Sequence, residues 1–141
     1  MKDWGLILDH LPLRTEERIV ARKFLEQPAG LLFVKVAEIF RVHGHTEECI
    51  AILSWGLQTH PSFGAARVKL AGELFQKGLI QESWDCLRRS PSSLAQNIIA
   101  QKLQFKCAIL LGFESYARSI IEGMYDQDFL DAGLAKLRTL F

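Results

Sequence analysis

The sequence of 141 residues contains few of the features that mark enzymes or membrane proteins. No serine or cysteine lies in a nucleophile motif, no glycine-rich phosphate loop follows a strand pattern, and no apolar run is long enough to span a bilayer. Basic and acidic residues number 17 and 16, which argues against a strongly basic face for nucleic acid. We therefore predict a protein that is not an enzyme, takes no cofactor or small-molecule substrate, and binds neither nucleic acid nor membrane.

Cysteine is also scarce, with three residues, and the N-terminal region lacks the continuous apolar stretch of a secretory signal. We interpret the cysteines as buried, reduced thiols and predict a cytoplasmic location. His43, His45 and Cys49 form the one cluster that resembles part of a zinc site. No second Cys or His pair follows at finger-like spacing, so we predict no metal site.

Three glycines, Gly44, Gly78 and Gly112, are spaced 34 residues apart. A period of this length is typical of stacked helix-turn-helix units. Each glycine lies where a first helix must stop and where a left-handed backbone conformation favours glycine. Apolar residues between the breaks follow helical periodicity, and no alternating run of strand type occurs. The sequence therefore predicts an all-α fold.

Large and small residues recur at the same positions relative to each of these glycines. The first repeat carries Phe33, Val36, Ala37, Phe40, Gly44, Cys49, Leu53, Gly56 and Pro61. The second repeat carries Leu70, Ala71, Leu74, Gly78, Ser83 and Leu87, and the third repeat carries Phe105, Ala108, Gly112, Ala117 and Ile121. This pattern resembles the tetratricopeptide repeat, with a third copy that is degenerate because Phe105 and Ala108 exchange the large and small sites. The resemblance implies a short α-solenoid of antiparallel helix pairs.

The expected organisation is a single domain of 141 residues. It comprises an N-terminal lead-in and helix at 1–29, repeats at 30–63 and 64–97, a degenerate repeat at 98–125, and a C-terminal helix at 126–141. Thr15 is expected to cap the helix that ends before Pro28, and Ser93 with Gln96 to form a capping box. Further helices are predicted at 31–42, 46–59, 62–77, 80–89, 92–111 and 113–124.

Other polar and aromatic residues receive structural interpretations. The carboxylate pairs Glu16–Glu17 and Glu47–Glu48 are interpreted as first-turn charges on solvated helix starts. Trp55 and Trp84 are interpreted as packing residues of second helices. No catalytic residue is predicted.

In the tetratricopeptide family, first helices line a concave face that commonly receives a peptide. The resemblance therefore implies a groove lined by Val34, Lys35, Glu38 and Arg41, by Val68, Lys69 and Phe75, and by Lys102, Leu103 and Lys106, with Val42, Gly72, Gln76, Ile109 and Leu110 beside them. Lysines among apolar side chains suit a partner that combines hydrophobic anchors with negative charge. The alternative is that the lysines only keep the surface soluble.

The C-terminal segment carries an apolar stripe at helical spacing, which consists of Leu130, Leu134, Leu137 and Phe141 with Leu140 beside it. Repeat arrays normally end in a helix with a polar outer face. We therefore expect an interaction scaffold that associates with itself through its terminal helices, binds a hydrophobic and acidic peptide in its groove, or does both. The alternative function is that of a chaperone like the tetratricopeptide chaperones of type III secretion, which cradle a secreted client.

Overall fold

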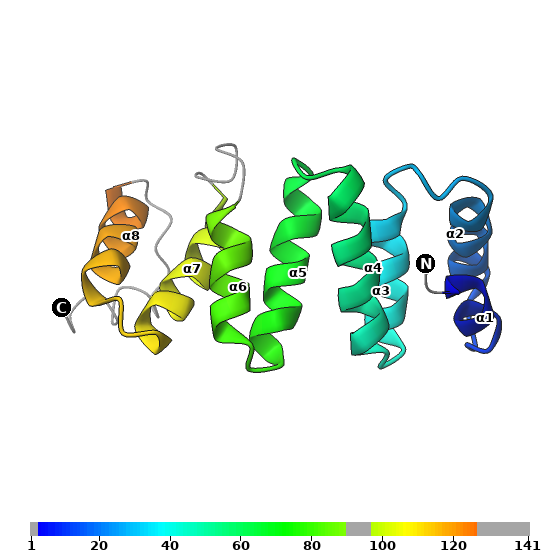
Figure 1. Cartoon of the computed structure of the whole chain (residues 1–141), viewed down its shortest axis with the longest axis horizontal. Coiled ribbons are helices and arrows are strands. Elements are labelled where there is room, and N and C mark those ends of the chain that lie inside the picture. The colour runs from blue at the N-terminus through cyan, green and yellow to red at the C-terminus, as the bar shows by residue number, and fades with distance from the viewer. Residues whose placement is uncertain (1–2, 90–96, 127–141) are drawn as a thin grey trace. The chain divides into compact units, whose positions relative to one another are not determined.

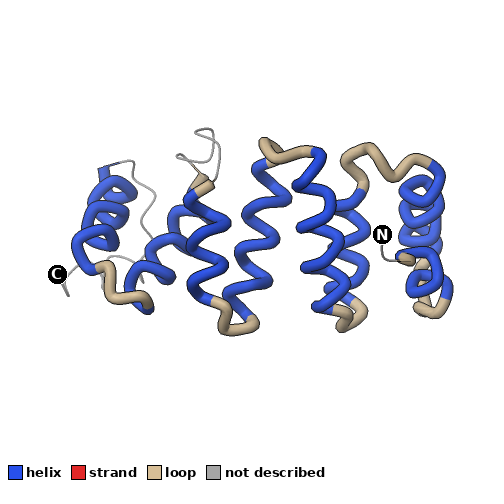
Figure 2. Tube along the Cα trace, in the orientation of Figure 1, coloured by secondary structure: helices blue, strands red, loops and turns tan. Residues whose placement is uncertain are grey.

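The computed structural model describes residues 3–89 and 97–126, and every regular element in these ranges is a helix (Figures 1 and 2). The all-α prediction is therefore confirmed for this part of the chain. The helices are α1 (Trp4–Asp9), α2 (Thr15–Glu26), α3 (Phe33–Val42), α4 (Thr46–Thr59), α5 (Gly64–Gln76), α6 (Ile80–Arg88), α7 (Ile98–Leu110) and α8 (Glu114–Asp126). They fall into two compact units, Met1–Ala66 and Arg67–Phe141, whose boundary lies within α5. Each unit is described by itself.

The three glycines of the 34-residue period end α3, α5 and α7 in the same way. Gly44, Gly78 and Gly112 have φ angles of 82°, 84° and 79°. The residue after each glycine donates its N–H to the carbonyl four residues before the glycine, in the pairs His45 to Phe40 (2.8 Å), Leu79 to Leu74 (2.9 Å) and Phe113 to Ala108 (2.8 Å). This is the Schellman arrangement, which satisfies the last carbonyls of a helix. The predicted left-handed glycine turns are confirmed at all three positions.

The core of the first unit forms between α3 and α4, which pack together. Phe33, Val36, Ala37 and Phe40 from α3 face Cys49, Ile52 and Leu53 from α4, and all of them are buried. Gly56 lets the two helices approach closely, because a Cβ added there would overlap the ring of Phe33. Small residues at the marker positions therefore give the close packing that the repeat pattern predicts.

The core of the second unit joins α5, α6, α7 and α8. Leu70, Ala71, Ser83, Leu87, Phe105, Ala108, Ala117 and Ile121 are all buried at their marker positions. The Ser83 hydroxyl donates to the carbonyl of Ala71 at 2.7 Å, and the Cys107 thiol donates to Ser83 Oγ at 3.6 Å. A buried polar side chain is stable here because it is hydrogen-bonded. The exchanged positions Phe105 and Ala108 are both buried on α7, so the degenerate copy still contributes to the core.

Several predicted helix starts differ from the structure. The lead-in contains helix α1, whose N-terminus is capped by the Asp3 side chain accepting from the Leu6 N–H at 3.1 Å. Thr15 is the first residue of α2 and not its cap. Helix α7 begins at Ile98 and not at residue 92, because the Asn97 side chain accepts from the Ala100 N–H at 3.0 Å and sets the start. The Ser93–Gln96 capping box lies outside the described residues.

Candidate functional site

The predicted binding residues of the first unit lie on α3. Val34 is half-buried and Lys35 is exposed. Arg41 Nε donates to Glu38 Oε2 at 2.9 Å, so these two charges largely neutralise each other. Lys35 forms no ion pair with any other described residue and supplies the unpaired positive charge of this helix face.

Among the predicted residues of α5, Val68, Gly72 and Phe75 are half-buried, whereas Lys69 and Gln76 are exposed. Val68 and Phe75 therefore offer only part of their surface to a partner. Residues 68–76 belong to the second unit, whereas α3 belongs to the first. A single groove across both units stays a prediction.

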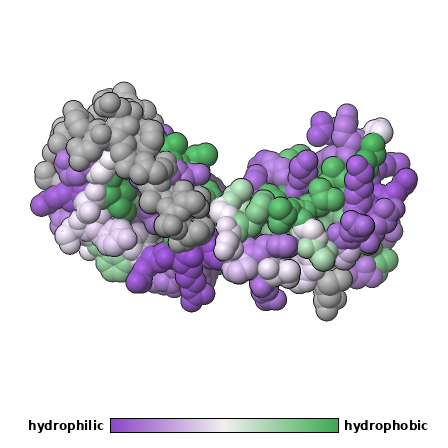
Figure 3. Space-filling view, turned by 90° about the horizontal axis from the view of Figure 1, so that it is seen from above, coloured by the Kyte–Doolittle hydropathy of each residue, from purple (hydrophilic) through white to green (hydrophobic). Residues whose placement is uncertain are grey.

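Helix α7 has apolar residues on two sides. One side carries Ala100, Phe105, Cys107 and Ala108 and is buried in the second unit. The other side exposes Ile99 by 65%, Ile109 by 42% and Leu110 by 62%. On the face drawn in Figure 3, hydrophobic patches lie among hydrophilic side chains. An amphipathic helix of a globular protein normally has a polar outer side, so α7 departs from the usual pattern.

Lysines border the exposed apolar residues of α7. Lys102 and Lys106 are four residues apart and lie on the same side of the helix as Ile99, Leu103 and Leu110. Lys106 is exposed and forms no ion pair with another described residue, whereas Lys102 and Leu103 are half-buried. We call residues Ile99, Lys102, Leu103, Lys106, Ile109 and Leu110 the α7 face. Lys106, Ile109 and Leu110 are exposed members of the predicted binding surface, and the structure adds Ile99, which was not predicted.

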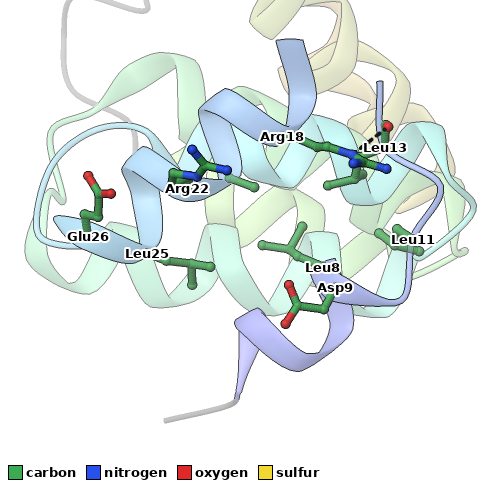
Figure 4. A pocket seen from close by; sticks show the side chains of 9 residues that line it. Leu8, Asp9, Leu11, Leu13, Arg18, Arg22, Leu25 and Glu26 are labelled. Atoms are coloured by element: carbon green, nitrogen blue, oxygen red, sulfur yellow. Dashed lines mark hydrogen bonds between the residues drawn. The ribbon is translucent and has the colours of Figure 1, made fainter. Parts of the chain in front are cut away.

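The first unit also contains a pocket that the sequence analysis missed (Figure 4). It has a volume of about 480 Å³ and lies between α1 and α2. Its lining consists of Leu8, Asp9, Leu11, Leu13, Arg18, Ala21, Arg22, Leu25 and Glu26. The spacing of residues 18, 21, 22 and 25 on one side of α2 is the signal by which it could have been found.

The pocket combines an aliphatic interior with charged side chains. Arg18 Nε donates to the Leu13 carbonyl at 3.2 Å, which holds this guanidinium beside the pocket. Asp9, Arg22 and Glu26 are exposed and form no ion pairs with other described residues. Apolar surface surrounded by polar groups of both signs is typical of protein-binding sites.

Glu17 is buried, so its interpretation as a solvated first-turn charge was wrong. The Arg14 backbone N–H donates to Glu17 Oε1 at 2.9 Å, and His43 Nε2 lies 3.3 Å from both carboxylate oxygens. The Arg14 N–H, together with His43, lowers the pKa of Glu17 despite the opposing effect of burial. Nothing local in the sequence indicates this contact, because Glu17 and His43 are 26 residues apart.

The remaining histidines and cysteines have structural surroundings. His45 Nδ1 lies 3.5 Å from Glu48 Oε2, and the His60 ring stacks on Phe33. Within residues 3–89 and 97–126, no group of three His, Cys, Asp or Glu side chains is arranged to hold a metal ion. Cys49, Cys86 and Cys107 are buried, as predicted. Burial raises the pKa of the Cys86 and Cys107 thiols, which disfavours the reactive thiolate.

Trp55 on α4 and Trp84 on α6 both pack against other aromatic rings. Trp55 contacts Phe24 and Phe33 edge-on, and Trp84 contacts Phe113 and Tyr116. Their interpretation as packing residues is confirmed.

The predicted self-association residues, Leu130, Leu134, Leu137, Leu140 and Phe141, lie outside the described residues. In the described part of the chain, none of the helices combines the length and the apolar character that crossing a membrane requires. Comparison with known proteins found no matching family model, no similar curated protein and no similar solved structure. The tetratricopeptide resemblance therefore stays a prediction that depends on the repeated turns and packing positions.

Proposed function

We propose that this protein is a non-catalytic interaction module that binds a protein segment combining aliphatic and acidic side chains. The α7 face of the second unit makes the main contact, and the outward face of α3 in the first unit is a separate candidate contact.

The observation that carries the proposal is the exposure of Ile99, Ile109 and Leu110 beside Lys106. Burying apolar surface contributes about 25 cal/mol per Å², so covering these side chains favours association. Lys102 and Lys106 add attraction for carboxylates and disfavour basic partners. Because the lysines are four residues apart, acidic residues three or four apart on a partner helix match their spacing.

Fluorescence anisotropy with labelled synthetic peptides tests this proposal. The probe is a peptide that carries leucines at helical spacing with glutamates between them, and its matched control carries lysines in place of the glutamates. We expect the acidic peptide to bind the full chain and the basic peptide to bind at least tenfold more weakly. Affinity for the acidic peptide should fall as salt rises, because salt screens charges at exposed surfaces.

Variants locate the contact. Lys106→Glu should weaken binding of the acidic peptide about three- to tenfold, which corresponds to about 1 kcal/mol. Leu110→Asp should weaken it further, and both residues are exposed, so the fold tolerates the changes. Arg88→Glu makes the same charge change on exposed α6 residue Arg88 and should leave binding unchanged. Equal binding of the acidic and basic peptides, or equal effects of Lys106→Glu and Arg88→Glu, would refute the proposal.

A further inference from the structure

We infer that the pocket between α1 and α2 is a self-assembly site, which accepts the apolar stripe of residues 127–141 from a second copy of the chain. This goes beyond the α7 face and does not depend on it, because the pocket lies wholly within the first unit. Three features support this: the aliphatic lining, the charges at its margin that pair with no described residue, and the sequence of residues 127–141.

The lining requires an occupant with aliphatic side chains. Leu8, Leu11, Leu13, Ala21 and Leu25 supply the apolar surface, and no hydroxyl or amide side chain is among the lining residues. Leu8 and Ala21 are buried, while Leu25 is 45% exposed at the margin. A leucine-rich stripe suits this surface, because leucine side chains fill it without leaving polar groups unsatisfied.

The charges of the pocket are mixed, which disfavours a simple anion. Two guanidinium groups, Arg18 and Arg22, are accompanied by two carboxylates, Asp9 and Glu26. An anionic ligand would meet attraction and repulsion together. A protein segment that carries both signs meets both kinds of charge, and such matching gives an interface its specificity.

Residues 127–141 carry charges in the matching order. Asp131 follows Leu130 and Arg138 follows Leu137, so the two charges lie on one side of the predicted apolar stripe, seven residues apart. In the helix that the sequence predicts at 126–141, a rise of about 1.5 Å per residue would place them about 10 Å apart along the axis. On α2, the midpoint of Arg18 and Arg22 precedes Glu26 by six residues, or about 9 Å. A segment parallel to α2 therefore brings Asp131 to the arginines and Arg138 to Glu26.

The contact is heterologous, because the two surfaces that meet differ from each other. Each copy offers one pocket and one segment, so association continues into a ring or an open chain of copies.

Sedimentation velocity of the full chain across a dilution series tests the inference. We expect the mass to rise with concentration. Leu25→Asp should weaken self-association more than tenfold, and Arg22→Glu should weaken it about three- to tenfold. Lys23→Glu is the matched control, since Lys23 is an exposed neighbour on α2 that does not line the pocket, and it should have no effect.

Charge reversal on both sides identifies the occupant. Asp131→Arg should weaken association to the same degree as Arg22→Glu, and the double variant Arg22→Glu with Asp131→Arg should restore it. A synthetic peptide of residues 127–141 should compete and return the full chain to monomer. Circular dichroism checks that each variant remains helical.

Three results would overturn the inference: a strict monomer at high micromolar concentration, association that the pocket variants leave unchanged, or a double variant no better than the single ones. The peptide-binding test of the α7 face uses separate variants and a separate probe. Failure of self-assembly is therefore distinguishable from failure of the proposed function.

Discussion

Gly56→Ala offers the sharpest test of how the first unit packs. Gly56 lies inside α4, where alanine is intrinsically favoured over glycine by about 1 kcal/mol. An added Cβ would, however, overlap Cγ, Cδ2 and Cε2 of Phe33. The packing between α3 and α4 therefore opposes the local preference of the helix, and the structure predicts which effect is larger.

The surroundings of Phe33 determine the magnitude. Phe33 has no solvent exposure, and its ring is held between those of Trp55, His60 and Phe63, whose centroids lie 5.9–6.5 Å from its own. The overlap includes Cγ at the base of the ring, so rotation about χ2 does not relieve it. Overpacking of a core typically costs about 1–3 kcal/mol. Taking the upper end and subtracting the helix preference leaves a net loss of about 2 kcal/mol.

Urea unfolding followed by circular dichroism measures this loss. With a slope of about 2 kcal/mol per molar urea, the midpoint for Gly56→Ala should fall by about 1 M. Gly72→Ala is the matched control, because it lies inside α5 with no atom within 4 Å of an added Cβ. That variant should gain up to about 1 kcal/mol. Adding Phe33→Leu to Gly56→Ala should recover part of the loss. A Gly56→Ala variant as stable as the parent would refute this account of the packing.

Two further predictions concern buried polar side chains. Ser83→Ala should reduce the free energy of unfolding by about 1 kcal/mol, because it removes the hydrogen bond to the Ala71 carbonyl and the acceptor of the Cys107 thiol. Urea unfolding measures this loss. If the free energy of unfolding does not fall, the Ser83 hydroxyl contributes nothing to stability. Because folding lowers the pKa of Glu17 below its usual 4.5, the stability from this carboxylate is present above that pH and is lost as the pH falls through the lower folded value. Below about pH 4.5, the free energy of unfolding of Glu17→Gln should therefore decrease less steeply with falling pH than that of the parent protein. Glu16→Gln is the control, because Glu16 is the exposed neighbour, and it should keep the steeper decrease. Identical pH profiles for the parent protein and Glu17→Gln would contradict this prediction.

The sequence predicted the features that depend on local chemistry. Gly44, Gly78 and Gly112 end their helices as expected, because a left-handed turn has a strong residue preference. Helix α4 has the predicted limits at Thr46 and Thr59, because His60 and Pro61 follow it directly. Local residue preferences therefore account for most of the helix ends.

Features that depend on distant contacts were missed. The Glu17–His43 pair joins residues that no spacing rule connects, and the first-turn position of Glu17 favoured the wrong interpretation. The pocket was missed because residues 4–13 were expected as an apolar lead-in without a helix of their own. Of the predicted binding residues, Arg41 proved to be paired with Glu38, and their spacing of three residues on one helix is a signal by which this pair could have been predicted.

The Schellman turns also have a consequence for the order of folding. Each turn closes through hydrogen bonds between residues at most five apart in sequence, so it requires little loop-closure entropy. The helical hairpin α3–α4 and the hairpin α7–α8 therefore have low contact order, which is associated with fast folding. We expect these hairpins to form early and the docking of α2 through Glu17 and His43 to follow, so that substitutions at the turns slow folding while substitutions at Glu17 mainly speed unfolding.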